Sequence, residues 1–115
     1  MSPSIPALQE YVSSNFFGSF VADQRNVSVG ASPTKLLDHS FERMSFVLVN
    51  LGAEAIYVKP SSDPSTTSGI YIGASGGFLS VDVHSDLILP GYEWYAVTAS
   101  GTSDVFIIEI NRYQV

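Results

Sequence analysis

Apolar and polar residues alternate along much of the chain after residue 26. The clearest alternation covers residues 78–83, where one side would carry Phe78, Ser80 and Asp82 and the other Leu79, Val81 and Val83. This pattern is typical of a half-buried β-strand, because successive side chains of a strand point to opposite faces of its sheet. Short apolar runs separated by Gly, Pro, Ser and Asp recur roughly every 8 to 12 residues, as expected of an all-β sandwich. We therefore predict one antiparallel β-sandwich, of jelly-roll or Ig-like type, over residues 26–115.

Two hairpins are predicted within this domain. Residues 44–51 are apolar on both faces, so we expect a central strand there, with residues 52–60 returning beside it after a tight turn. Residues 93–115 are expected to form a second hairpin around residues 99–103, where a glycine can adopt the positive φ that the turn needs.

The first 25 residues differ from the rest of the chain. Pro3 and Pro6 interrupt any regular start, and the apolar residues that follow show no strand alternation. We predict an extended N-terminal arm over residues 1–25, with a short helix that fits the apolar spacing over residues 7–14. Burying one phenylalanine ring contributes about 2–3 kcal/mol, so the aromatic side chains of the arm must pack on their own domain or on a neighbouring subunit. The predicted partner contacts from the arm are Tyr11, Phe16, Phe17 and Phe20.

Composition narrows the classes of function. Charged residues make up 14% of the chain, and the net charge is −6. A surface that is polar but poor in charge suits permanent contacts in shells and fibres. The negative charge and the scattered cations disfavour binding to nucleic acid, and the absence of cysteine excludes disulfides and thiolate metal sites. The sequence has no run of 18 apolar residues and no cationic, apolar leader, so we expect neither a membrane span nor Sec-type secretion.

A candidate metal site lies in the segment VDVHSD, residues 81–86. Asp82, His84 and Asp86 would share one face of an extended strand, with neighbouring side chains about 7 Å apart. The three would then span about 13 Å, which is too far for one ion unless the chain turns at Ser85. We favour a solvent-facing polar row at the end of a strand and expect neither a metal nor another cofactor.

The sequence shows no catalytic motif. A Ser–His–Asp arrangement has no G-x-S-x-G elbow to support it. The segment GASGG at residues 73–77 lacks the lysine and the helix pattern of a phosphate loop and is interpreted as a tight turn between strands. Tyr92 and Trp94, with the polar loop 61–69, could form a sugar-stacking platform, an alternative weighed against packing of Trp94 in the core. We predict that the chain is not an enzyme.

One cation is expected to have a specific partner. Arg43 lies directly before an apolar strand and close to two acidic residues. We expect it to pair with Asp38 or Glu42, or to reach another subunit, and we therefore count it among the predicted partner contacts.

Four segments together resemble a pattern found in small virion proteins of tailed bacteriophages. They are NVSVGASPTKLL at residues 26–37, ERMSFVLVNLGAEAIYV at 42–58, SGIYIGASGGFLSVDV at 68–83 and EWYAVTASGTSDVFIIEI at 93–110. The resemblance implies a β-sandwich that lies on the phage head or is attached to other structural proteins. It implies no catalytic residues, because proteins of this type bind by their surfaces.

The composition and the resemblance together predict a structural virion protein. We expect a decoration or cement protein that stabilises the head through contacts between shell subunits. Its expected partners are the major capsid protein or another virion structural protein, and further copies of itself through the arm. We expect it on the head surface of the virion, after assembly in the host cytoplasm. The alternatives are a neck, tail or fibre-attachment protein and a carbohydrate-binding module.

Overall fold

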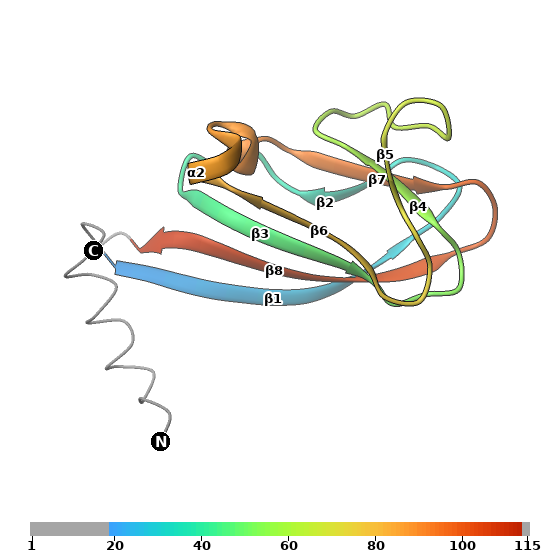
Figure 1. Cartoon of the computed structure of the whole chain (residues 1–115), viewed down its shortest axis with the longest axis horizontal. Coiled ribbons are helices and arrows are strands. Elements are labelled where there is room, and N and C mark those ends of the chain that lie inside the picture. The colour runs from blue at the N-terminus through green and yellow to red at the C-terminus, as the bar shows by residue number, and fades with distance from the viewer. Residues whose placement is uncertain (1–18, 114–115) are drawn as a thin grey trace, which may run out of the picture.

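Two antiparallel β-sheets pack face to face in the computed structural model, which describes residues 19–113 (Figure 1). The long sheet has the strand order β1-β8-β3-β6 and consists of β1 (Ser19–Val29), β8 (Ser103–Tyr113), β3 (Arg43–Asn50) and β6 (Gly77–Asp82). The short sheet has the order β2-β7-β4-β5 and consists of β2 (Thr34–Leu37), β7 (Trp94–Thr98), β4 (Ile56–Lys59) and β5 (Ile70–Ile72). This arrangement confirms the predicted all-β sandwich.

The core lies between the two sheets. Its buried apolar side chains are Val29, Leu36, Leu37, Phe46, Leu48, Ile56, Val58, Ile72, Val81, Trp94, Ala96, Val105 and Ile107. Trp94 is 1% exposed, and its ring meets that of Phe46 edge-on with the centroids 5.2 Å apart. The indole Nε1 donates a 3.0 Å hydrogen bond to the carbonyl of Leu89, so the polar atom of the ring has a partner. Trp94 is therefore a core residue and does not form the alternative sugar-stacking platform.

The two predicted hairpins are wrong, because the strands of each pair belong to different sheets. β3 pairs with β8 and β6, whereas β4 pairs with β7 and β5. β7 likewise lies in the short sheet and β8 in the long sheet. The turns after β3 and β7 thus carry the chain across the sandwich. Alternation determines which side chains face inward, and successive strands satisfy it equally well from opposite sheets. β3 is nevertheless a central strand, as predicted.

β1 begins at Ser19, well before the predicted start of the sandwich at residue 26. It pairs with β8 along its whole length without a break in register. Residues 19–25 are thus a strand of the long sheet and not part of an arm. Alternation did not indicate this strand, because β1 lies at the edge of its sheet and residues 22–26 are all exposed. The helix predicted over residues 7–14 lies outside the described residues.

A turn of helix replaces the strand predicted beyond Asp82. α2 (Val83–Asp86) follows β6 directly, and the short 3₁₀ helix η1 (Leu89–Gly91) comes next. Oδ1 of Asp82 accepts a 2.9 Å hydrogen bond from the backbone N–H of Ser85, which caps the turn. Oδ2 of Asp86 accepts a 3.0 Å bond from the N–H of Asp82. The predicted polar row along an extended strand is therefore wrong. Although the chain does turn here, no three Asp, Glu or His side chains gather as metal ligands within residues 19–113.

The glycine-rich segment 73–77 forms the turn from β5 to β6, as predicted. Gly76 has a φ of 115°, a backbone conformation that residues other than glycine rarely adopt. A Cβ added at Gly77 would lie 2.7 Å from the backbone nitrogen of Gly73, so the chain passes too closely there for another residue type.

Candidate assembly surface

The outer face of the long sheet carries a continuous group of apolar side chains, which we name the apolar face. It consists of Val47 and Val49 on β3, Phe78 on β6, and Phe106, Ile108 and Ile110 on β8. The strand register places Val49 between Phe78 and Phe106, and Val47 beside Ile108. Phe78 is 69% exposed and Ile108 is 38% exposed, while the other members are half-buried. Water therefore reaches every part of this group.

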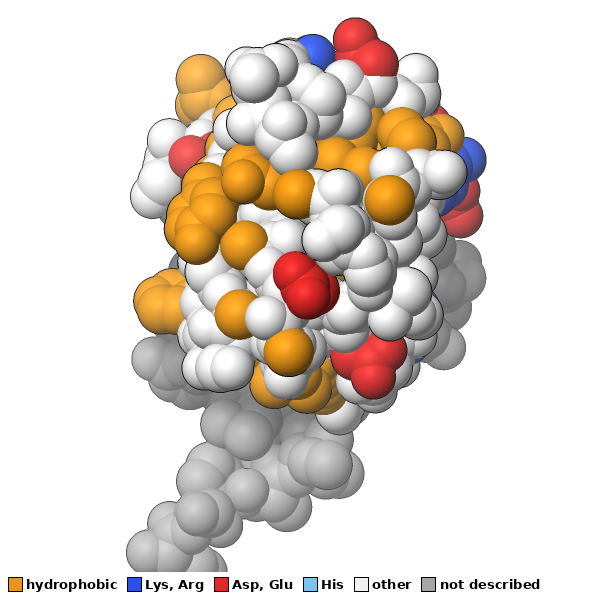
Figure 2. Space-filling model, turned by 90° about the vertical axis from the view of Figure 1, so that its right-hand side faces the viewer, with side chains coloured by type: hydrophobic (Ala, Val, Ile, Leu, Met, Phe, Trp, Pro, Cys, Tyr) orange, Lys and Arg blue, Asp and Glu red, His pale blue; other side chains and the backbone are white. Residues whose placement is uncertain are grey.

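Charged side chains on this outer face are confined to the ends of the strands. At the described outward positions of the long sheet, they are Asp82, Asp104 and Arg112. Figure 2 views the end of the molecule at the right of Figure 1, where apolar side chains lie among uncharged polar ones with acidic side chains between them. Burying one apolar side chain contributes about 1.5–3 kcal/mol, and contiguous apolar patches commonly mark interaction sites. The apolar face is therefore well suited to bury against another protein.

A second apolar surface, the end groove, lies where β3 begins and where α2 and η1 meet. It has a volume of about 310 Å³ and is lined mainly by Phe41, Met44, Val83, Leu87, Ile88 and Tyr92. Phe41 is 87% exposed and Leu87 is 72% exposed. Leu87 also has a φ of 56°, a backbone conformation that is uncommon for a residue with a branched side chain. The end groove thus presents apolar groups to solvent at some local conformational cost.

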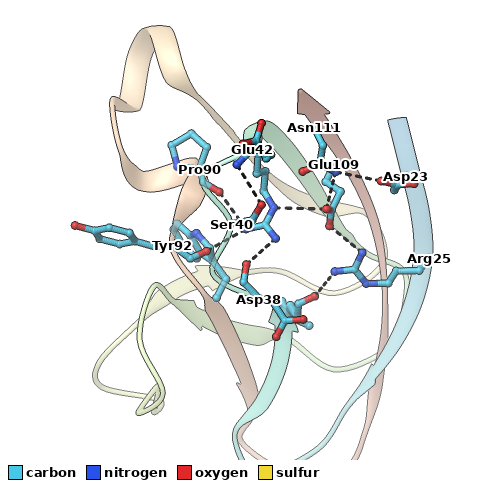
Figure 3. A network of polar contacts seen from close by, with 12 residues as sticks. Asp23, Arg25, Asp38, Ser40, Glu42, Pro90, Tyr92, Glu109 and Asn111 are labelled. Atoms are coloured by element: carbon cyan, nitrogen blue, oxygen red, sulfur yellow. Dashed lines mark hydrogen bonds and ion pairs between the residues drawn. The ribbon is translucent and has the colours of Figure 1, made fainter. Parts of the chain in front are cut away.

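Arg43 is buried and joins four segments of the chain. Its partners Asp38, Pro90, Tyr92 and Glu109 are labelled in Figure 3. Its Nη1 donates hydrogen bonds to the carbonyls of Pro90 at 3.2 Å and Tyr92 at 3.1 Å. Its Nη2 donates a 2.7 Å bond to the carbonyl of Asp38, so the predicted pairing with Asp38 is made to the backbone and not to the carboxylate. Its Nε lies 3.7 Å from Oε1 of Glu109 on β8. With 2% of its side chain exposed, Arg43 offers almost no surface to another subunit.

Glu109 connects Arg43 to the edge strand β1. Nη1 of Arg25 donates a 2.8 Å hydrogen bond to Oε2 of Glu109, and Nδ2 of Asn111 donates a 2.8 Å bond to Oε1. Burial raises the pKa of Glu109, but the hydrogen bonds from Asn111 and Arg25 and the charge of Arg43 outweigh it, so the pKa lies below its ordinary value of 4.5. Burial lowers the pKa of Arg43, and the charge of Glu109 opposes this. Both groups are ionised at neutral pH, because the pKa of Glu109 lies below 4.5 and arginine retains its proton in proteins.

A charged pocket of about 420 Å³ lies beside this network, next to β1 and β2. Its ionisable lining residues are Arg25, Lys35, Asp38, Arg43 and Glu109. These charges contact other groups of the same chain. Nη2 of Arg25 donates a 2.6 Å hydrogen bond to the carbonyl of Leu36, and Nζ of Lys35 lies 3.2 Å from a carboxylate oxygen of Asp38. The pocket therefore belongs to a structural link between the edges of the two sheets.

Two of the predicted partner contacts fall on described residues, Phe20 and Arg43. Phe20 lies on β1 opposite Arg112, on the same outer side of the long sheet as the apolar face, and is half-buried. The other three, Tyr11, Phe16 and Phe17, lie outside the described residues. The sequence reasoning missed the apolar face, although the signal was present. The two apolar faces of residues 46–49 indicated a central strand, and the same pattern also provides the exposed apolar positions.

Comparison with known proteins adds information on the fold. No family model matches this chain, and no curated protein matches it. Among solved structures, it is similar to a chain from Bacillus endospore appendages, described as a novel family of disulfide-linked pili. The TM-score is 0.51 at 9% sequence identity, and the match covers 83% of this chain and 89% of that chain. At this identity the likeness shows a common sandwich fold.

The helices in the described part of the chain are all too short or too polar to cross a bilayer.

Proposed function

We propose that this chain is a structural subunit that acts through surface contacts, and specifically that it is a decoration or cement protein of a tailed-phage head. The observation that supports this most is the apolar face, where exposed apolar side chains lie together and the charges lie at the strand ends. The sequence resemblance to small phage virion proteins supports the setting. The fold shared with a pilus chain supports a part in a protein assembly.

The proposed mechanism is mechanical. The sandwich would lie over a junction between shell subunits with its apolar face against them. Each bound copy lowers the free energy of the assembled shell relative to its separate parts, by mass action. Because a shell repeats the same junction many times, contacts of a few kcal/mol each sum to a large stabilisation. The expected partner is the major capsid protein or another virion structural protein, on the head surface.

A neck, tail or fibre-attachment protein would use the same surfaces, so copy number distinguishes it from a head protein. A carbohydrate-binding module is less well supported, because its central residue Trp94 is 1% exposed. We further propose that the chain has no enzymatic activity and binds neither nucleic acid nor membrane, since the surfaces described here suit contact with protein.

The test is the number of copies in purified phage particles that contain this chain. Quantitative mass spectrometry should give a fixed ratio of the chain to the major capsid subunit, as expected for a protein that follows the symmetry of the shell. About twelve copies or fewer per particle would instead identify a neck, tail or fibre protein. Absence from particles would overturn the proposed virion role.

A further inference from the structure

We propose that β1 pairs antiparallel with β1 of a second copy and so joins two long sheets into one continuous sheet. This inference deepens the structural role proposed above and rests on it. β1 is a terminal strand of the long sheet, and β8 is its one partner strand among residues 19–113. Half of the backbone N–H and C=O groups of such a strand face away from their own sheet and can pair with another chain.

β1 differs from the other three edge strands of the sandwich. It has 11 residues, no proline, and an unbroken register with β8. In contrast, β5 has three residues, β2 has four with an irregular register, and β6 ends where the carboxylate of Asp86 accepts a hydrogen bond from the N–H of Asp82. Short strands, bulges and capped ends are the usual protection of an edge against pairing. β1 is long and regular, and its residues 22–26 are exposed. Its only protection of this kind is the pair of charges Asp23 and Arg25.

Symmetry, strand length and charge together favour one register. Directly opposed residues of an antiparallel pair point to the same side of the sheet, so a two-fold axis normal to the sheet must pass through a residue position. An axis at Gln24, the midpoint of Ser19–Val29, pairs all 11 positions. It also places Asp23 of each copy opposite the partner's Arg25, whereas an axis at Asp23 or at Arg25 would bring like charges together. The charges of this edge are therefore complementary to a second copy of the same edge.

The same axis places the two apolar faces on one side of the joined sheet. The outward residues Phe20 and Ala22 would lie opposite the partner's Ser28 and Asn26, so no charge enters the joint on that side. Two apolar faces would then form one broad surface. A continuous apolar surface is the kind of contact that the proposed function requires.

Cysteine cross-linking tests this register, because the chain has no cysteine of its own and any disulfide must join two copies. In the Gln24→Cys variant the two copies of residue 24 would lie directly opposite each other at the axis. Their Cα atoms would then be close enough for a disulfide between the two thiols. Ser28→Cys is the matched control, since Ser28 is exposed on the same face of the same strand. Its two copies would be about 26 Å apart. Mild oxidation should double the mass of most Gln24→Cys chains on a non-reducing gel and leave Ser28→Cys chains as monomers.

Analytical ultracentrifugation of the unmodified chain provides the second measurement, with a dimer as the expected species. A monomer at all concentrations, or equal cross-linking of both variants, would overturn the proposal. Larger assemblies without a cross-link at residue 24 would overturn the pairing of β1 and leave the structural role intact. Cross-linked dimers from a chain that is absent from phage particles would instead support the pairing and contradict the virion role.

Discussion

The hydroxyl of Ser103 donates a 2.6 Å hydrogen bond to Oδ1 of Asn50, and both side chains are buried. Nδ2 of Asn50 donates to the carbonyl of Glu54 at 2.8 Å and to that of Gly73 at 3.1 Å. One amide thus ties the end of β3 to the start of β8, to the turn before β4 and to the turn before β6. Such a fully bonded buried group holds its neighbours in a single arrangement.

Gly52 is a glycine because this junction has no room for a larger residue. A Cβ at position 52 would lie 2.7 Å from Cα of Ser103 and 2.8 Å from the backbone nitrogen of Asp104. We expect Gly52→Ala to lower the free energy of unfolding by roughly 1–3 kcal/mol, because backbone atoms would have to move. Gly30→Ala is the control, since nothing lies within 4 Å of its added Cβ. Equal urea midpoints for the two variants would contradict this account.

Arg43 is predicted to stabilise the fold and not an interface. Arg43→Lys keeps the charge but cannot reach the carbonyls of Asp38, Pro90 and Tyr92 with the same planar fork. We expect it to lower the free energy of unfolding by about 2–4 kcal/mol, since buried polar groups lose their partners. Arg112→Lys, at an exposed position, should change it by less than about 0.5 kcal/mol. A role in contacting a partner would appear as weaker assembly with unchanged denaturation.

Glu109 should make stability depend on pH in the acid range. Its pKa in the folded chain lies below 4.5, so on acidification the unfolded chain binds a proton first. The stabilisation is fully present above about pH 5 and is lost as the pH falls through the folded pKa. Glu109→Gln should therefore be less stable than the unmodified chain near neutral pH, and its stability should fall less on acidification. Urea denaturation at several pH values measures both slopes, and parallel slopes would rule out this role.

The sequence was sufficient to predict most strands of the core but not their partners. β2 is the exception, because residues 31–43 were interpreted as an irregular connection. The alternation at residues 78–82 and the apolar run at residues 44–51 correspond to β6 and β3. Which sheet a strand joins depends on contacts with residues far along the chain. The sequence of a turn is also similar whether the turn closes a hairpin or connects the two sheets of a sandwich. The first half of β1 was missed because its exposed residues 22–26 carry no apolar pattern.

The candidate assembly surface and the Arg43 network were likewise predicted only in part from the sequence. The contact of Arg43 with Glu109 joins residues on strands that only the fold brings together, so no local motif indicated it. The apolar positions of residues 46–49 were visible in the sequence, but periodicity alone does not distinguish a face covered by another layer from a face open to solvent.

Since residues 19–25 belong to β1, the remaining part of the predicted arm is residues 1–18. This part should be separable from the sandwich by truncation after residue 18. If residues 1–18 act in assembly, removing them should reduce incorporation into particles while changing the free energy of unfolding by less than about 1 kcal/mol. Removing residues 1–25 should also remove part of β1, with its pairing to β8 and the 2.8 Å bond from Arg25 to Glu109, and so lower stability sharply. Comparable loss of stability in both truncations would place the arm in the core of its own domain.

Phe78 tests the apolar face most directly, because its side chain is 69% exposed and contributes little to the core. Phe78→Ser should leave the free energy of unfolding within about 1 kcal/mol of the unmodified value, and should weaken binding to particles by removing an apolar contact of about 2 kcal/mol per copy. Tyr71→Ser is the matched control, an aromatic residue that is 64% exposed on the short sheet. Co-sedimentation with particles that lack the chain measures binding. If Tyr71→Ser impairs binding and Phe78→Ser does not, the contact surface is the short sheet and not the apolar face.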